Sequence, residues 1–151
     1  MSMFSAFNIN ASGLTAQRLR MDVISENVAN AQTTRTEDGT PYRRKVVTFA
    51  QKGDQTSFSK VLGSVRNGYN GYSGQGVKVD GIYEDTNSEM KMVYDPSHPD
   101  ADENGYVTYP NVNIITEMTN LIDASRAYEA NSTAFSASKS MALQGLQLTQ
   151  Q

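Results

Sequence analysis

Cysteine and tryptophan are absent from this chain of 151 residues, and histidine occurs once, as His98. The lack of cysteine excludes a thiolate nucleophile, a disulfide framework and a zinc site with cysteine ligands. His98 lies between Pro96 and Pro99 in an acidic, turn-rich stretch, where a loop residue is a better interpretation than a general base. The P-loop, the dinucleotide fingerprint and the Gly-x-Ser-x-Gly motif are also absent. We therefore expect no enzyme activity, cofactor, metal or small-molecule substrate.

Charge and long apolar runs are scarce as well. The net charge is −3, which argues against nucleic acid as a partner because phosphate binding needs a basic face. The short basic run 43–45 is interpreted as a charged strand edge or as a contact with an acidic partner. No apolar stretch is long enough to span a bilayer, and the first basic residue, Arg18, comes too late for a secretory signal. We expect a cytoplasmic protein, or one exported without a cleaved Sec signal.

Glycine and proline are almost missing from the two ends of the chain. All 4 prolines lie between Pro41 and Pro110, and of the 11 glycines only Gly13 and Gly145 fall outside the range 39–105. This distribution predicts helical ends around a middle that is rich in turns.

Apolar residues recur at seven-residue spacing in both ends, which predicts helices at 3–30 and 113–148 with coiled-coil character. Asn111 or Asn113 is expected to cap the second helix, and Gly145 is a candidate for its end. The apolar residues that we expect to form an assembly interface are Phe7, Leu14, Met21, Ile24, Val28, Ile114, Met118, Leu121, Tyr128, Phe135 and Leu146.

The C-terminal helix is too long for a compact domain to cover. About 36 residues span about 54 Å, whereas a globule of this chain length is about 40 Å across. From Ala130 to Gln151 the only charged residue is Lys139, although a solvated helix usually carries many charges. We expect both ends to remain unpaired until other chains enclose them. The alternatives are an α-helical hairpin within one chain and a soluble coiled-coil adaptor.

The predicted fold class is α+β, with long terminal helices packed as an axial core around a small β-rich middle domain. Alternating β-branched and aromatic residues predict strands at 45–49, 76–83, 90–94 and 105–109. The range 55–74 is predicted to be a long loop, or to contain a short helix near 58–65. The predicted organisation is an N-terminal axial helix (1–31), a connecting loop (32–45), a small β-rich domain (46–110) and a C-terminal axial helix (111–151).

The segment from Asp100 to Gly105 matches the first half of an EF-hand calcium loop, with oxygen-bearing side chains at the first, third and fifth positions. The twelfth position is Asn111 instead of a bidentate glutamate, and Pro110 precedes it. An Asp/Asn/Gly turn that leads into a strand is the simpler interpretation. A cation-binding module at this segment is the weaker alternative.

Two N-terminal runs, 10–14 and 21–31, resemble the signature of the flagellar rod and hook axial proteins, with Met21 and Val28 in place of two leucines. Further segments resemble the proximal-rod members of that family, in the same order along the chain. These segments are Thr40–Lys45, Gly76–Val79, Val93–Val107, Tyr109–Asn113 and Glu117–Asn131.

The resemblance implies a structural subunit of the bacterial flagellar basal body. In such a subunit the terminal helices pack into the axial core of the proximal rod, the β-rich middle lies further out, and the assembly transmits torque. The implied partners are other rod proteins, the membrane-ring base, further copies of the chain and the flagellar type III export apparatus. The implied location is the rod in the periplasmic space, and the acidic turn at Asp100–Gly105 becomes a family feature instead of a calcium site.

Overall fold

The computed structural model describes residues 3–52, 62 and 75–148, with the side chains of the outermost helical positions left aside. Apart from Leu62, the predicted loop or short helix in 55–74 lies outside the described residues. The α+β class is confirmed, since two long helices flank antiparallel strands. The described elements, in chain order, are α1 Met3–Ala29, β1 Lys45–Gln51, β2 Val77–Glu84, β3 Lys91–Tyr94, β4 Tyr106–Tyr109 and α3 Ile114–Leu148.

Each helix and strand predicted outside 55–74 is confirmed to within two residues of its predicted bounds. Asn113 is the cap of α3, because its Oδ1 accepts hydrogen bonds from the N–H groups of Ile115 (3.0 Å) and Thr116 (3.3 Å). The helix does not end at Gly145 but continues to Leu148. Neither described helix is long and apolar enough to cross a membrane.

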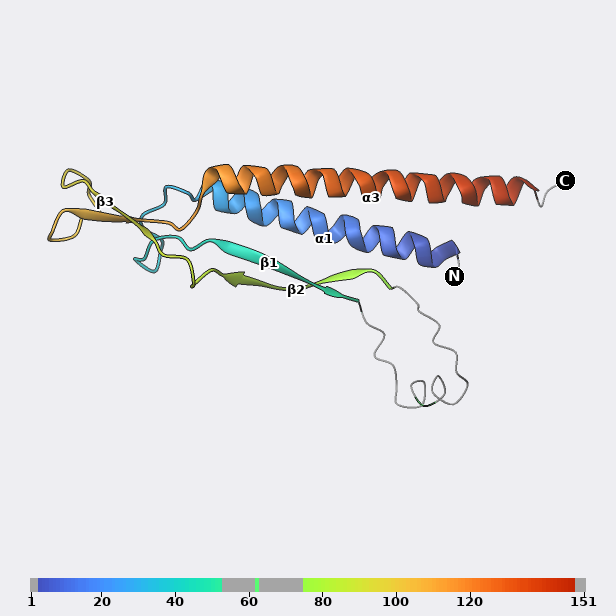
Figure 1. Ribbon diagram of the computed structural model, residues 1–151, viewed down its shortest axis with the longest axis horizontal. Coiled ribbons are helices and arrows are strands. Elements are labelled where there is room, and N and C mark those ends of the chain that lie inside the picture. The colour runs from blue at the N-terminus through green and yellow to red at the C-terminus, as the bar shows by residue number, and fades with distance from the viewer. Residues whose placement is uncertain (1–2, 53–61, 63–74, 149–151) are drawn as a thin grey trace.

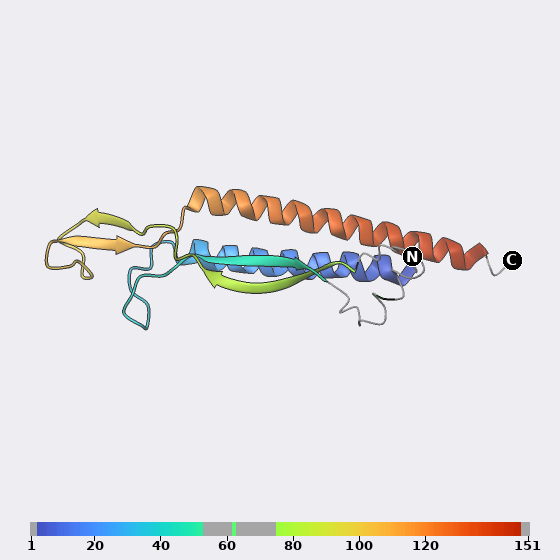
Figure 2. The ribbon, with the colours of Figure 1, turned by 60° about the horizontal axis from the view of Figure 1, so that its bottom comes forward.

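Helix α1 is the central layer of the molecule. It runs antiparallel to α3 on one side, and the β1–β2 hairpin lies along another side (Figure 1; Figure 2). The expectation that both ends stay unpaired is therefore corrected: within one chain, α1 and α3 form the α-helical hairpin of the alternative interpretation. The β1–β2 hairpin covers another side of α1, so α1 packs against two elements while α3 packs mainly against α1.

The expected β-rich middle consists of two separate two-stranded sheets. Strands β1 and β2 pair from Lys45↔Glu84 to Gln51↔Val77, with a bulge between Thr48 and Phe49. Strands β3 and β4 form a second hairpin that projects beyond the end where α1 stops and α3 starts (Figure 1). The molecule is therefore elongated, with helices at one end and a β ribbon at the other.

The apolar core is thin because the molecule is built of layers that are one element thick. The buried apolar side chains of the described residues are Ala16, Val23, Ile24, Tyr42, Val107 and Ala124. Two of the largest side chains that are almost completely buried are polar, Glu117 and Asn27. What they contact is therefore central to the stability of the fold.

Candidate assembly interface

A buried polar cluster joins the end of α1, the start of β1 and the first turn of α3; we call it the polar junction and define it as Asn27, Tyr42, Arg44, Lys45 and Glu117. The Asn27 side chain, which is 0% exposed, lies at its centre. Its Nδ2 donates to the Lys45 carbonyl oxygen (2.8 Å) and to Glu117 Oε2 (3.0 Å). Its Oδ1 accepts from the Tyr42 hydroxyl (2.9 Å) and the Lys45 N–H (2.9 Å). The amide thus makes all four of its possible hydrogen bonds, so only asparagine in this orientation fits.

The carboxylate of Glu117 is buried, at 1% exposure, and the guanidinium of Arg44 neutralises its negative charge. Arg44 Nε and Nη2 both donate to Glu117 Oε1, at 2.9 and 2.7 Å, while Oε2 is held by Asn27. Arg44 Nη1 also lies 3.7 Å from Asp85 Oδ2. A buried carboxylate persists only when it is paired and hydrogen-bonded, and both conditions hold here.

Tyr42 closes the junction from the loop that precedes β1. Burial raises the pKa of the Tyr42 phenol to about 12, and the negative charges of Glu26, Glu117 and Glu84 act in the same direction. The phenol is therefore a neutral donor to Asn27 Oδ1 throughout the physiological pH range.

Asn111 ties the β1–β2 hairpin to the segment that enters α3. Its Oδ1 accepts from the Arg44 N–H (2.9 Å), and its Nδ2 donates to the carbonyl oxygens of Asp85 (2.9 Å) and Ser88 (3.3 Å). The Ser88 hydroxyl and N–H hydrogen-bond the Asp85 carboxylate and lower its pKa, which fixes the turn that Asn111 contacts. The position that was compared with the last ligand of a calcium loop thus has a structural role instead.

The run 10–14 places α1 in close contact with both of its neighbours. Ser12 Oγ accepts a hydrogen bond from the Val77 N–H (3.1 Å), and a Cβ at Gly76, whose φ is 93°, would lie 2.2 Å from that oxygen. On the other side, a Cβ at Gly13 would lie 2.9 Å from Asn131 Oδ1 on α3. These small residues therefore allow three layers to approach one another closely.

The structure divides the expected interface residues of α1 into two groups. Ile24 is buried against the rest of the chain, at 6% exposure. The others are half-buried, namely Phe7, Leu14, Met21 and Val28. The Phe7 ring packs edge-on against the ring of Phe135, with 5.1 Å between centroids, so part of the predicted seam lies inside one chain.

On α3 the expected interface residues differ more in exposure. Leu121 and Phe135 are half-buried against α1, whereas a further four are exposed. The exposed residues are Ile114, Met118, Tyr128 and Leu146. No contact with another chain tests these assignments, and they remain a prediction.

Each helix also has an exposed face that apolar periodicity does not reveal. We define the outer stripe of α1 by its exposed residues at three- and four-residue spacing: Asn8, Ala11, Thr15, Arg18, Asp22, Ser25 and Ala29. We define the outer stripe of α3 in the same way: Ile115, Thr119, Ile122, Arg126, Glu129, Thr133, Ser136, Ser140 and Leu143. This spacing is that of a heptad seam, so both stripes have the geometry to receive another helix.

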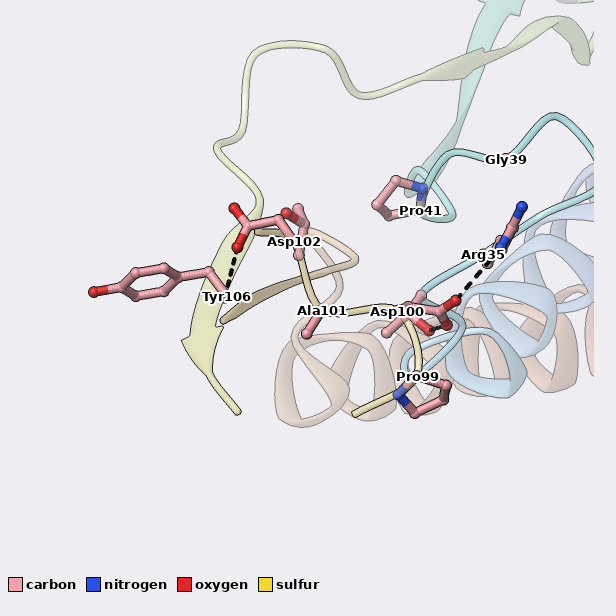
Figure 3. A pocket seen from close by; sticks show the side chains of 10 residues that line it. Arg35, Gly39, Pro41, Pro99, Asp100, Ala101, Asp102 and Tyr106 are labelled. Carbon is pink, nitrogen blue, oxygen red and sulfur yellow. Dashed lines mark hydrogen bonds and ion pairs between the residues drawn. The ribbon is translucent and has the colours of Figure 1, made fainter. Parts of the chain in front are cut away.

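The acidic turn forms one wall of an open hollow of about 340 Å³ between the loop after α1 and the β3–β4 connection (Figure 3). Asp100 accepts a hydrogen bond from the Thr34 hydroxyl (2.7 Å) and lies 3.9 Å from Arg35. Asp102 Oδ1 accepts from the N–H groups of Asn104 (2.9 Å) and Tyr106 (2.8 Å). These carboxylates thus fix a turn that leads into β4, and no group of three potential metal ligands lies within the described residues.

The other chemically notable residues have structural partners too. His98 Nδ1 accepts from the Asp100 N–H (3.1 Å), as expected of a loop residue. In the basic run, Arg44 and Lys45 form ion pairs with Glu117 and Glu26. Two of its three charges are therefore satisfied within the chain, so the run is no free basic patch.

Comparison with known proteins identifies the family. Residues 7–35 match the model of the flagella basal body rod proteins, and residues 103–148 match that of the C-terminal region of flagellar basal body rod FlgEFG proteins. The flagellar basal-body rod protein FlgC of Bacillus subtilis is 47% identical over 98% of this chain and 99% of its own length. The chain belongs to the FlgC family of flagellar basal-body rod proteins. FlgC of Borreliella burgdorferi (49% identity, 99% of both chains) and of Salmonella typhimurium (39% identity, 99% of this chain, 100% of its own length) extend the match.

The two regions matched by the family models supply the two sides of contacts described above. The N-terminal region 7–35 contributes Asn27 and Ser12, and the C-terminal region 103–148 contributes Glu117 and Asn131. The polar junction is the residue set that sequence reasoning missed. Asn27 lies in the run 21–31 that resembles the family signature, but periodicity does not indicate which residues hydrogen-bond a buried asparagine.

Proposed function

We propose that the chain is a structural subunit of the proximal rod of the flagellar basal body, which assembles through its terminal helices and transmits motor torque. The observation that carries this proposal is the uncovered surface of α3. Apart from the contact of Glu117 with Arg44, the helix packs on α1 alone, and residues 130–148 carry Lys139 as their one charge. A helix of this composition is suited to close packing on several sides and not to isolation in water.

The polar junction supports the mechanical part of the proposal. It connects α1, β1 and α3 through buried, charge-assisted hydrogen bonds, including 2.7 Å between Arg44 Nη2 and Glu117 Oε1. A subunit that passes a twisting load between neighbours needs its layers to move together. Hydrogen bonds at fixed geometry resist sliding of one helix along another better than small apolar contacts do.

The partners in this proposal are other copies of the chain, other rod proteins and the membrane-ring base, with the rod located in the periplasmic space. Delivery occurs through the flagellar type III export apparatus. The narrow, layered shape with its thin core is compatible with unfolding before passage through such an apparatus.

The test is to delete the gene in a bacterium that carries it and to isolate basal bodies before and after complementation. We expect cells without the chain to be non-motile and to lack complete rods, and the restored chain to appear in purified basal bodies by mass spectrometry. Leu121→Asp should fail to restore motility, whereas Leu121→Met, which keeps the apolar volume, should succeed. Complete rods in cells that lack the chain would refute the proposal.

A further inference from the structure

The outer stripes of α1 and α3 carry charges in the same order along the chain, a basic residue before an acidic one. Along α1, Arg18 is followed one turn later by Asp22; along α3, Arg126 is followed by Glu129. All four residues are exposed, and within the described part of the chain none of them takes part in an ion pair. When two such helices lie antiparallel, Arg18 meets Glu129 and Asp22 meets Arg126.

From this complementarity we propose that the outer stripe of α1 binds the outer stripe of α3 of a second copy of this chain, antiparallel, with Arg18 opposite Glu129. The proposal rests on the proposed function, which it deepens by naming the faces that meet. Both stripes have heptad spacing, so the pairing continues along the helices in layers as in an antiparallel coiled coil.

Residues on either side of the charges fit the same alignment. Ser25 faces Ile122, which is 52% exposed in the single chain, and Ala29 faces the level of Thr119. The small side chain of Ser25 therefore lies opposite a large one, which allows Ile122 to insert between the helices. Towards the other end, Thr15 faces Thr133, and both are exposed.

The charges select one register among those that the heptads allow. A shift by one heptad in one direction places Arg18 against Ile122, and a shift in the other direction places it against Ser136. In both cases the guanidinium and the Asp22 carboxylate lie without partners in a helix contact, which is unfavourable. The alignment with Arg18 opposite Glu129 is the one that pairs both.

The proposed contact is offset from the contact inside the chain. Within one chain Gly13 lies against Asn131, which places Arg18 near the level of Arg126. In the proposed contact Arg18 lies at Glu129, three residues further, or about 4.5 Å along the helix axis. Each added copy is therefore displaced along the axis, and a repeated head-to-tail contact with such a displacement gives an open helical array instead of a closed ring.

The absence of cysteine makes a cross-linking test direct. One variant carries Thr15→Cys and a second, with a tag of different size, carries Thr133→Cys; both are expressed in one cell that lacks the natural gene. Both hydroxyls bond only their own helix backbone, so the substitutions are mild. Because each stripe faces away from the other helix of its own chain, a cross-link must join two copies.

We expect mild oxidation of isolated basal bodies to give a mixed dimer on a non-reducing gel. The matched control pairs Thr15→Cys with Ser140→Cys, one heptad away on the same stripe, and should give none. Basal bodies that contain both variants but no mixed dimer would overturn the contact while leaving the proposed function intact. A cross-linked product whose mass is not that of two copies would overturn the assignment of the partner. Absence of the natural chain from basal bodies would instead refute the proposed function.

A charge exchange gives a second measurement that needs no oxidation. We expect Arg18→Glu or Glu129→Arg alone to lower the expansion rate of swimming halos about tenfold, because each replaces an attraction by a repulsion in every subunit contact. The double variant R18E/E129R restores the pair and should recover at least half of the rate. Failure of the double variant to exceed both single variants would overturn the proposed pairing.

Discussion

Replacing Asn27 by Asp changes one group of the polar junction, with almost no change in volume. The two hydrogen bonds donated by Nδ2, to the Lys45 carbonyl (2.8 Å) and to Glu117 Oε2 (3.0 Å), are lost. A carboxylate oxygen then faces the Glu117 carboxylate in a site where both side chains are fully buried. Uncompensated burial of a charge costs about 3–5 kcal/mol, which is a large part of the 5–15 kcal/mol typical of a folded domain.

The assay is equilibrium unfolding in urea, followed by far-UV circular dichroism, on Asn27→Asp and on the control Asn8→Asp. Asn8 lies on the same helix but is exposed, so the free energy of unfolding of its variant should lie within about 0.5 kcal/mol of that of the natural chain. The free energy of unfolding falls by about 2 kcal/mol per molar urea, so Asn27→Asp should lower the urea concentration at the unfolding midpoint by about 2 M. A loss below about 1 kcal/mol would show that Asn27 is not enclosed by α1, β1 and α3, and would refute the junction.

Three further predictions address other parts of the fold. Gly76→Ala should lower the free energy of unfolding by about 2 kcal/mol or more, because the added Cβ would meet Ser12. The control Gly39→Ala also has a positive φ but open space around its Cβ, and it should cost about 1 kcal/mol. Equal losses in the two variants would contradict the close contact at Gly76. Between pH 10 and pH 12 the free energy of unfolding should fall by about 2 kcal/mol, since the pKa of Tyr42 is raised to about 12 and the stabilisation is complete only below the ordinary value of 10.0. Tyr42→Phe should lack this dependence in urea titrations, and an unchanged slope would exclude Tyr42 as its source. His98→Ala should leave motility unchanged and cost less than about 1 kcal/mol in the same titration; a non-motile strain would reopen a chemical role for this residue.

The helices and strands were predictable because their signals are local. The spacing of Leu121, Tyr128 and Phe135 predicts a helix without knowledge of its partner, and alternation in 76–83 predicts a strand in the same way. The arrangement of the strands was not predictable to the same degree. Nothing local to β1 or β2 states that their hairpin lies on α1 and apart from β3 and β4.

The side of α3 that packs on α1 shows where periodicity fails. Met118 and Leu146, which we expect in an assembly interface, are exposed, whereas Ala124 and Ser138 are the buried residues of this helix together with Glu117. Closely packed helices use small residues at their contact, and small residues carry little apolar signal. Apolar periodicity therefore does not show which face of α3 packs on α1, and the assembly role of Met118 and Leu146 stays a prediction.

The polar junction could not be predicted because its members are far apart in the sequence. Asn27 and Glu117 are separated by 90 positions, yet they share a hydrogen bond. Taken alone, Asn27 is a polar residue near the end of a helix, and Glu117 is an acidic residue in the first turn of a helix, where it suits the helix dipole. Only the tertiary structure shows that these features satisfy one another.

The composition of the two outer stripes follows from what a subunit must avoid before it assembles. A stripe of leucine and isoleucine would associate in any register and in solution, because apolar burial is not directional. Small and polar residues with two charges contribute little in one contact, about 1 kcal/mol for each exposed pair, and favour one register. In an array every copy makes the contact twice, once through each helix, and is held by further neighbours. A variant with a more apolar α3 stripe, Thr133→Leu, should therefore form soluble aggregates at concentrations where the natural chain remains monomeric. Analytical sedimentation measures this difference. Unchanged sedimentation of the variant would refute this role of the polar residues.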